Sequence, residues 1–579
     1  MTLSVKSKEN VAIELTSDLK YTILEYVSDQ LQIRRVSKNF LLDCGIESKY
    51  DFFNIIRKQY RSQSWLPRPL NKQLVKLGPF EGVLTVCLAV IQDAKRILGL
   101  DGYQQAHEGA MVKYQSELSP YRLQDLTHLT TLRKAQDTIK VFSKIAESVP
   151  TARDFLQGMP ADIDLIQKAE RIRNWMNEGQ HRLELGSVLE LNLAGQGLSS
   201  IPDEVRFLRN LQILNLQNNQ LRELTLPDTL TALRGLDVSN NQLTKFEIPR
   251  TCTQLQFVSA KDNQLTEMII PENLVNLQGL DFTDNRLERF VIPGILPQLQ
   301  KLGLSQNRLR TFIIPIDFLP ELRELYLVQN QIREFAIRGN LPHLEKLNLS
   351  TNKLERLILP DLNALQVLAV DHNQLTEFKI PRTCTQLRQV FSNDNQLTEM
   401  IIPETLVNLQ SLNFINNRLE RFVIPGILPQ LQSLCLSQNR LRTFIIPIDL
   451  LPELKELYLA QNQIREFSIL GNLPRLQKLI LSDNQLERLI LPDLNELVVL
   501  AADHNKLTEF EIRPGTLTAL KLLGLNDNQL TKFAIPATST ELQEFFIARN
   551  QLTEFEFPRT CTKLQNVVLA CNKLNKLLN

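Results

Sequence analysis

Hydrophobic and polar positions alternate in a short, regularly repeated pattern along the second two thirds of the chain. In one unit, Leu236 and Val238 alternate with polar neighbours, and Leu233 and Leu243 flank this alternation. A period of two predicts a short strand with one buried face. Close variants of L-x-x-L-x-L-x-x-N-x-L return every 21 to 23 residues. This fixed period predicts that the strands of successive units stack in parallel.

An asparagine follows the strand in seventeen of these units, and one further unit, at Leu191, carries Gln196 in the same position. A side-chain amide can both donate to and accept from backbone groups where the chain leaves a sheet. The sequence therefore predicts a ladder of buried amides. The asparagines are Asn219, Asn241, Asn263, Asn285, Asn307, Asn330, Asn352, Asn373, Asn395, Asn417, Asn439, Asn462, Asn484, Asn505, Asn528, Asn550 and Asn572.

The segment that returns from one strand to the next, such as Phe246-Glu247-Ile248-Pro249, combines a buried Phe and Ile with a proline. Proline blocks a regular helix, so this side should be extended or 3₁₀-like. The whole pattern resembles leucine-rich repeats. We therefore predict an α/β-type solenoid of about eighteen repeats over 189–579, with a parallel concave sheet and a mostly non-helical convex side.

Apolar positions before the repeats recur at helical spacings of three and four residues, as in 123–145 and 163–177. We expect an all-helical amino-terminal region. The sequence divides it into a helical segment at 1–60, a helical domain at 61–160 and, at 161–188, a helix that caps the first repeat.

The segment 15–40 is similar to the F-box, on Leu15-Thr16-Ser17-Asp18-Leu19, Ile23-Leu24-Glu25-Tyr26-Val27 and Arg34-Arg35-Val36-Ser37-Lys38-Asn39-Phe40. This resemblance implies docking on a Skp-type adaptor of a cullin ubiquitin ligase. The implied docking residues are Leu15, Leu19, Ile23, Val27, Leu31 and Val36. The segment departs from the family pattern where Thr16 replaces proline and Phe40 replaces tryptophan. The alternative is a pair of amphipathic helices in an ordinary cap.

Composition narrows the function classes. The net charge is +1 and 22% of residues are charged. The chain therefore has no overall positive field that would attract a nucleic acid, so we expect no nucleic-acid partner. The seven cysteines are odd in number and unpaired in spacing, and they predict a reducing cytosol. The longest apolar run, 82–91, is too short to span a bilayer, so we expect no membrane span.

A tandem duplication lies within the repeats, because residues 249–380 recur as 381–512. The outer segments hardly differ, and Asn285 to Pro293 returns unchanged as Asn417 to Pro425. Strand positions expected on the concave face differ in about half of the cases. We interpret this as retuning of a binding surface; unequal copying between repeats is the alternative.

The positions predicted to face outward from the strands carry aromatic and charged residues. Rigid aromatics beside charges are typical of interface hot spots, although each one taken singly could be an exposed residue without a partner. The candidate partner-binding residues are Tyr326, Lys346, Asp371, His372, Phe391, Ile415, Tyr458, Lys478, Asp503, His504 and Phe546.

Catalysis finds little support in the sequence. The Asp371-His372 and Asp503-His504 pairs lack a nucleophile at a recurring distance, and their adjacent side chains should point different ways. No phosphate-binding glycine loop and no zinc motif occurs, so no cofactor or metal is expected. Bacterial leucine-rich repeat ubiquitin ligases carry Cys-x-Asp, which is absent here.

The phrase Asn-Gln-Leu-Thr-Glu-Phe and the lead-in Ile172-Arg173-Asn174-Trp175-Met176-Asn177-Glu178 resemble leucine-rich repeat proteins of host-associated intracellular bacteria. We predict a non-enzymatic protein-binding module that captures a protein partner on its concave face. The resemblance implies a secreted effector that acts in a host cytosol. The competing prediction is a scaffold that self-associates through an uncapped carboxy-terminal edge, with the helices serving only as a cap.

Overall fold

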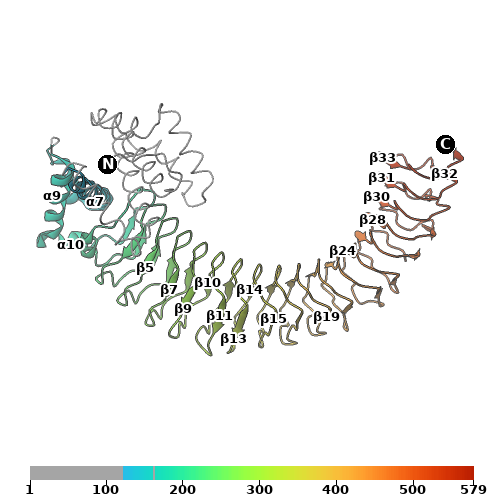
Figure 1. The fold of residues 1–579 in the computed structure, drawn as a ribbon, viewed down its shortest axis with the longest axis horizontal. Coiled ribbons are helices and arrows are strands. Elements are labelled where there is room, and N and C mark those ends of the chain that lie inside the picture. Colours follow the sequence, from blue (N-terminus) through green and yellow to red (C-terminus); the bar gives the residue numbers. More distant parts are fainter. Residues whose placement is uncertain (1–120, 161–162, 579) are drawn as a thin grey trace, which may run out of the picture. The chain divides into compact units, whose positions relative to one another are not determined.

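The computed structural model describes residues 121–160 and 163–578, and these fall into two compact units. The first unit contains residues 121–143 and 151–178, and the second contains 144–150 and 179–578 (Figure 1). The segment that resembles the F-box, with Leu15, Leu19, Ile23, Val27, Leu31 and Val36, lies outside the described residues. The prediction of adaptor docking therefore stays a prediction.

The described part before the repeats is helical, as the apolar spacing predicts. Its helices are α7 (Tyr121–Ser148), α8 (Pro150–Gln157) and α9 (Leu165–Asn177). In the first unit the ring of Phe142 contacts that of Trp175 edge-on at 5.2 Å between centroids, and Phe155 stacks on Trp175 at 5.7 Å. Asp164 caps α9 by accepting a hydrogen bond from the backbone N–H of Gln167. An aromatic cluster thus holds these helices together.

The second unit enters its solenoid through the short helices η1 (Gly179–His181) and α10 (Arg182–Leu185). Leu185 and Val188 are buried, and the side-chain amide of Asn210 donates to the carbonyl of Gly186 at 2.8 Å. This entry segment is therefore tied to the coil that follows it. A capping role for the helix at 165–177 remains a prediction.

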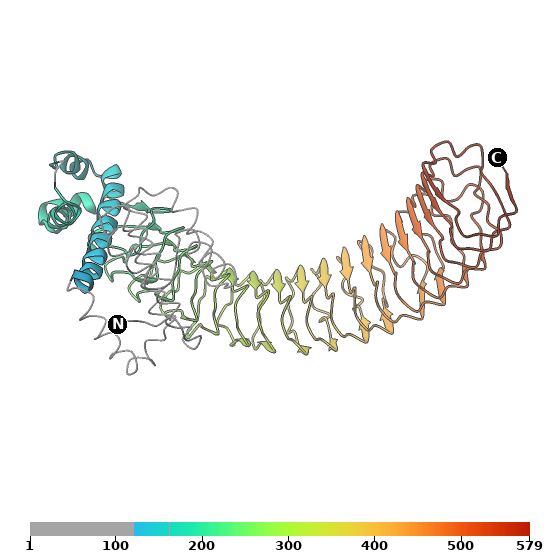
Figure 2. The same ribbon diagram turned by 45° about the horizontal axis from the view of Figure 1, so that its top comes forward.

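One parallel sheet of 18 strands runs through the second unit, with each strand paired to that of the next repeat (Figure 2). It lines the concave side of the solenoid in Figure 1. The predicted solenoid is confirmed. The strands are β1 (Glu190–Asn192), β2 (Ile213–Asn215), β4 (Gly235–Asp237), β6 (Phe257–Ser259), β8 (Gly279–Asp281), β10 (Lys301–Gly303), β12 (Glu324–Tyr326), β14 (Lys346–Asn348), β16 (Val367–Ala369), β18 (Gln389–Phe391), β20 (Ser411–Asn413), β22 (Ser433–Cys435), β24 (Glu456–Tyr458), β26 (Lys478–Ile480), β28 (Val499–Ala501), β30 (Leu522–Gly524), β31 (Glu544–Phe546) and β33 (Asn566–Val568).

The convex side is extended rather than helical, apart from η2 (Asp203–Phe207), because prolines punctuate the return segments. Its short strands pair two by two into parallel ribbons. These strands are β3 (Glu223–Thr225), β5 (Lys245–Glu247), β7 (Glu267–Ile269), β9 (Arg289–Val291), β11 (Thr311–Ile314), β13 (Glu334–Ile337), β15 (Arg356–Leu357), β17 (Glu377–Phe378), β19 (Glu399–Ile401), β21 (Arg421–Val423), β23 (Thr443–Ile446), β25 (Glu466–Ile469), β27 (Arg488–Leu489), β29 (Glu509–Phe510), β32 (Glu554–Glu556) and β34 (Lys576–Leu578).

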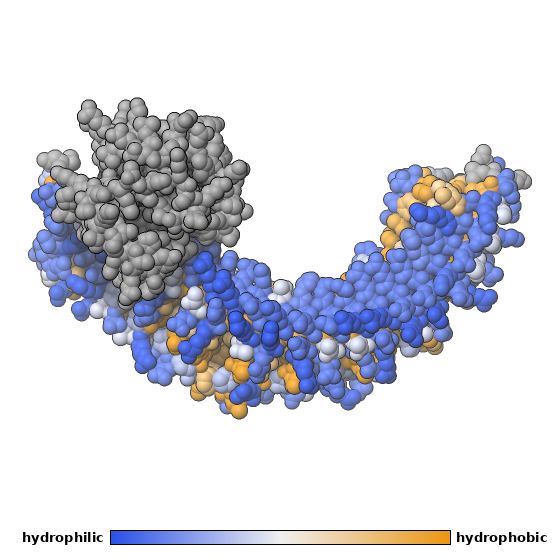
Figure 3. Space-filling model, viewed as in Figure 1, coloured by the Kyte–Doolittle hydropathy of each residue, from blue (hydrophilic) through white to orange (hydrophobic). Residues whose placement is uncertain are grey.

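Phenylalanines of the return segments fill the core, as their position predicts. Nine of them are buried, namely Phe246, Phe312, Phe335, Phe378, Phe444, Phe467, Phe510, Phe533 and Phe555. The equivalent Phe290 and Phe422 are only half-buried. Aliphatic side chains such as Ile316 and Ile358 remain exposed, and hydrophobic residues gather along the convex margin in Figure 3.

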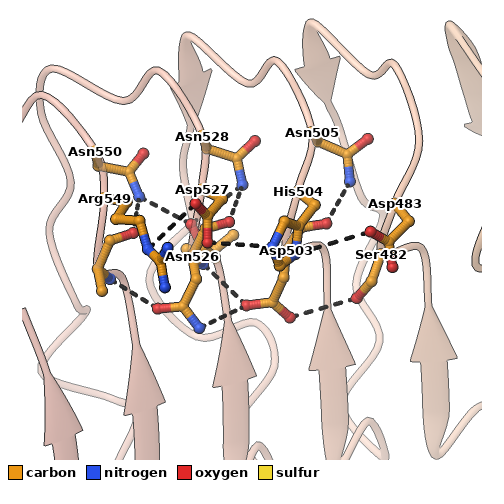
Figure 4. Close-up of polar contacts among 12 residues, drawn as sticks. Ser482, Asp483, Asp503, His504, Asn505, Asn526, Asp527, Asn528, Arg549 and Asn550 are labelled. Carbon is orange, nitrogen blue, oxygen red and sulfur yellow. Dashed lines mark hydrogen bonds and ion pairs between the residues drawn. The ribbon is translucent and has the colours of Figure 1, made fainter.

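The asparagine ladder joins each repeat to its neighbour, as the sequence predicts. Asn528 accepts a hydrogen bond from the backbone N–H of Leu507 at 3.0 Å. Its amide donates to the carbonyls of Leu525 and Ala502 at 3.1 and 3.0 Å. Asn505, Asn528 and Asn550 stand in one row (Figure 4). Because these amides satisfy backbone groups of two adjacent coils, the ladder fixes the spacing between repeats.

The residue before each ladder asparagine adopts left-handed backbone geometry, with φ between 51° and 59° at all seventeen positions. This conformation is unfavourable for most residues with a Cβ, and it is best tolerated by Asn and Asp. The turn rotates this side chain away from the concave sheet toward its rim. The motif alone did not reveal this geometry.

Candidate functional site

Three side chains of each concave strand point away from the core. In the repeat of β12, Glu324, Tyr326 and Val328 are half-buried, whereas Leu325 and Leu327 between them are fully buried. The pairing of strands without any shift places equivalent residues of successive repeats side by side. The concave face therefore consists of three columns, which we name the first, middle and third columns after the positions of Glu324, Tyr326 and Val328.

The predicted aromatics share the middle column. Tyr326, Phe391, Tyr458 and Phe546 end strands β12, β18, β24 and β31, and all four are half-buried. Tyr326 and Phe391 are separated by β14 and β16, and Phe391 and Tyr458 by β20 and β22. At about 4.8 Å per strand, Tyr326, Phe391 and Tyr458 stand roughly 14 Å apart. The structure thus forms a spaced row of rings rather than an aromatic cluster.

Charged residues of the first column surround Tyr326. Glu324 accepts hydrogen bonds from the ammonium of Lys346 at 2.8 Å and contacts that of Lys301 at 3.2 Å. The ammonium of Lys301 also lies 5.5 Å from the centre of the Tyr326 ring. The hydrogen bond from Lys346 lowers the pKa of Glu324, so this carboxylate is charged at neutral pH.

The duplicated half repeats this arrangement around Tyr458. Lys478 donates to Glu456 at 2.8 Å, but Ser433 replaces the second lysine. Burial raises the pKa of both Tyr326 and Tyr458, so each phenol keeps its proton and can act as a hydrogen-bond donor. Both copies therefore present one aromatic ring beside a paired lysine and glutamate.

The aspartates predicted to bind a partner, Asp371 and Asp503, occupy the third column and have contacts that serve the fold. Asp503 accepts from the backbone N–H and side-chain amide of Asn526, both at 2.9 Å, and from the hydroxyl of Ser482 at 3.3 Å (Figure 4). Asp371 accepts from the backbone N–H of Asn393 at 2.7 Å. These bonds join adjacent repeats, a structural role that the sequence did not indicate.

The two histidines leave the sheet at the left-handed turn and reach the exposed rim. His372 Nδ1 lies 3.2 Å from a carboxylate oxygen of Asp394. His504 Nε2 lies 3.3 Å from Asp527, which also pairs with Arg549 at 3.3 Å (Figure 4). Contacts between basic and acidic side chains of successive repeats therefore follow the rim. The predicted divergence of each Asp-His pair agrees with these separate contacts.

The two copies of the tandem duplication, 249–380 and 381–512, differ in one part of the concave face and agree in another. At the first and middle columns, all positions of β6, β8 and β10 differ from their counterparts in β18, β20 and β22. In the next three strands only Asn348, which corresponds to Ile480, differs. Each copy thus carries one divergent panel, β6 to β10 or β18 to β22, and one retained panel, which contains Tyr326 or Tyr458. Phe391 and Ile415 lie in the divergent panel of the second copy.

Sequence reasoning missed Ile213 and Phe257 as candidate site residues. They lie in the first column, in β2 and β6, with exposed fractions of 44% and 53%. Phe257 is the only aromatic among the exposed large hydrophobic residues of the described ranges. The sequence did carry a signal for them, because each is the first residue of its strand, as the candidate Lys346 is in β14.

The described residues contain no group of three or more His, Cys, Asp or Glu side chains positioned for a metal ion. Within the same ranges, no helix is long and apolar enough to cross a membrane.

Family models match the repeats in four stretches. A BspA-type leucine-rich repeat region matches residues 209–310 and 501–578, and a leucine-rich repeat model matches 320–364 and 452–496. The repeats are leucine-rich repeats. The prediction of this repeat class is confirmed, whereas the resemblance of 15–40 to the F-box stays untested. No curated protein matches this sequence.

Three solved structures are similar to this chain over 64% to 76% of its length. YopM from Yersinia enterocolitica is 23% identical, with 76% of this chain and 97% of that chain covered and a TM-score of 0.49. YopM from Yersinia pestis, described as a leucine-rich effector protein, is 22% identical, with 75% and 99% covered and a TM-score of 0.41. The plant peptide hormone receptor RGFR1, in complex with RGF2, is 22% identical, with 64% and 80% covered and a TM-score of 0.39.

Proposed function

We propose that this chain is a non-enzymatic recognition protein whose concave leucine-rich repeat face captures a protein partner. The difference between the two copies is the observation that carries this proposal. The buried leucines, the asparagine ladder and most of the convex side are the same in both copies, while the outward positions of the divergent panels differ. A few buried or convex positions also differ, such as Ala260, which corresponds to Ser392, but substitution is concentrated at these outward positions. Such concentration is what a changing ligand requires and what stability alone does not.

The chemistry of the face supports a macromolecular partner. The face presents spaced aromatic rings beside paired charges, and aromatic anchors of this kind dominate binding energy at protein interfaces. Eighteen strands at about 4.8 Å give an inner arc on the order of 80 Å. Such an arc can contact a folded domain along several repeats at once.

A pull-down with matched variants tests the proposal. The triple variant Tyr326→Ala/Phe391→Ala/Tyr458→Ala removes three rings of the middle column and should lose the partners that the wild-type chain retains. A control triple variant should keep them, because it truncates the exposed convex residues Ile316, Ile448 and Ile490. Equal recovery of partners by the wild type and the concave variant contradicts the proposal.

We also propose that residues 15–40 link the captured protein to a Skp-type adaptor, which makes the chain a substrate receptor for a cullin ubiquitin ligase. The resemblance of this segment to the F-box is the support. Wild type should co-purify with a Skp adaptor, and Leu19→Asp/Ile23→Asp should not. If wild type does not bind the adaptor, this part of the proposal fails while partner capture on the concave face stands.

The proposed location is a reducing cytosol, including that of a host cell if the chain is a secreted effector. All five cysteines of the described residues are free thiols, which is consistent with that compartment. Light scattering separates this function from a scaffold. A mass that stays constant with concentration supports the receptor, and a rising mass favours self-association.

A further inference from the structure

A hollow of about 490 Å³ opens on the concave face over strands β2 to β10. Its wall contains the exposed Ile213 and Phe257, and its floor contains the backbone of Gly235 and Gly279. Lys301 closes it on the side of β10. All of these residues belong to the first column, so the hollow is a gap in an otherwise continuous row of side chains.

The two glycines create this gap. A Cβ on Gly235 would find its nearest neighbour, a side-chain carbon of Ile213, at 3.8 Å, so the space above this residue is open. A Cβ on Gly279 would lie 3.0 Å from the Phe257 ring, so the ring leans over this glycine. The free space therefore lies above Gly235, between an aliphatic side chain and an aromatic ring.

The surroundings of the hollow are acidic. Asp237 and Asp281 line it from the middle column, and each uses one carboxylate oxygen to accept from the backbone N–H two residues later, at 2.9 and 3.0 Å. The lining cation, Lys301, is already paired with Glu324 at 3.2 Å. Both aspartates are half-buried beside an apolar surface, an arrangement that favours an apolar group accompanied by a cation.

The duplicated half provides an internal comparison on the same backbone. The counterparts of Phe257, Gly279 and Asp281 are Gln389, Ser411 and Asn413. Gly235 and Asp237 precede the duplicated segment, and the strand in the same place before the second copy, β16, carries Val367 and Ala369. Side chains therefore occupy both glycine positions, and neither aspartate of the hollow is retained. The hollow and its negative charge are properties of the first half alone.

We propose that this hollow is a subsite for an extended segment of the protein partner, which inserts one large apolar side chain above Gly235 and sets an adjacent Lys or Arg against Asp237 and Asp281. The subsite rests on the proposed capture of a protein by the concave face, and it adds the chemistry that the partner must present. Burial of an apolar side chain supplies affinity, and the paired carboxylates select the neighbouring cation.

Peptide display on the full-length chain tests the subsite. A library of random 12-residue peptides is selected on wild type, and the binders are measured by fluorescence anisotropy. The binders should share a large apolar residue next to Lys or Arg. Gly235→Val should weaken them at least ten-fold, and Asp237→Asn/Asp281→Asn should weaken them while abolishing the preference for the cation.

The variants are chosen to preserve the fold, because Val367 already occupies the position equivalent to Gly235 and Asn413 that equivalent to Asp281. Ser411→Ala in the second half is the control and should leave affinity unchanged. Peptides that bind wild type and Gly235→Val equally overturn the subsite, as does a selection that enriches no peptide over the Gly235→Val chain.

A second readout separates failure of the subsite from failure of the proposed function. Peptides whose binding is lost in the Tyr326/Phe391/Tyr458 variant but is unaffected by Gly235→Val leave the function standing and overturn the subsite. A photo-crosslinking residue in place of Ile213 should capture the bound peptide. Crosslinking to another segment of the same chain instead overturns the subsite, because the hollow then has an internal occupant.

Discussion

Replacement of Asn352 by alanine tests whether the buried amides hold the repeats together. Its Oδ1 accepts from the backbone N–H of Ile332 in the preceding repeat at 3.0 Å. Its Nδ2 donates to the carbonyls of Leu327 and Leu349 at 2.9 and 3.0 Å. Because Asn352 is buried, water cannot replace these bonds without opening the structure.

The expected loss of stability depends on which backbone groups keep another hydrogen-bond partner in the variant. The carbonyl of Leu327 keeps a bond from Asn330, and that of Leu349 keeps one from Asn373. The N–H of Ile332 is left without an acceptor. An orphaned buried donor costs about 1–3 kcal/mol and each lost net bond about 1 kcal/mol, so the free energy of unfolding should fall by roughly 3–5 kcal/mol.

Hydrogen exchange measured by mass spectrometry is the suitable assay, because each repeat contacts mainly its neighbours and can open locally. Asn352→Ala should speed exchange in the peptides around Ile332, with smaller effects at distant repeats. Asn340→Ala, at an exposed asparagine, is the control and should leave exchange unchanged. A loss under about 1 kcal/mol in Asn352→Ala refutes the ladder as a source of stability.

Three further predictions follow from individual side chains. Burial raises the pKa of Cys252 to about 11, so iodoacetamide at pH 8 should label the exposed Cys571 and leave Cys252 unmodified by mass spectrometry. Burial also raises the pKa of Asp371, so its contribution to stability falls as pH rises through that pKa. Asp371→Asn retains the acceptor without the charge and should not lower the urea midpoint at pH 7, whereas a lowered midpoint contradicts this assignment. Gly524→Ala places a Cβ 2.5 Å from the carboxylate of Asp503 and should lower the free energy of unfolding, measured by thermal unfolding, by about 1–3 kcal/mol. Gly235→Ala, whose Cβ would have no atom closer than 3.8 Å, should leave stability nearly unchanged.

The concave aromatics show where sequence reasoning succeeded and where it stopped. The repeat period alone placed Tyr326, Phe391 and Tyr458 in one outward column, since the alternation of buried leucines fixes which side chains face away from the core. It did not give their surroundings. The two contacts of Lys301, with Glu324 and with the Tyr326 ring, join residues more than twenty positions apart in the chain.

The contacts of the third column and of the rim could not be predicted from the sequence and came from the structure. Asp503 looked like a surface acid in the motif, but its carboxylate is held by Ser482 of the preceding repeat and Asn526 of the following one. His504 was predicted to point away from Asp503, but only the left-handed backbone, with φ of 53°, shows that it is directed to the rim. A backbone angle and a contact between repeats are not encoded in local hydrophobic spacing.

The sequence by itself determined the repeat length, the strand positions, the buried leucines and the amide ladder, because each follows from a local pattern repeated many times. The tertiary structure alone decided which polar side chains are used by the fold, and where the surface is hollow. The gap above Gly235 exists only because Ile213 and Phe257, each 22 residues away, stand beside it in neighbouring strands. Side-by-side stacking at unshifted register turns distant positions into one surface, which no single repeat contains.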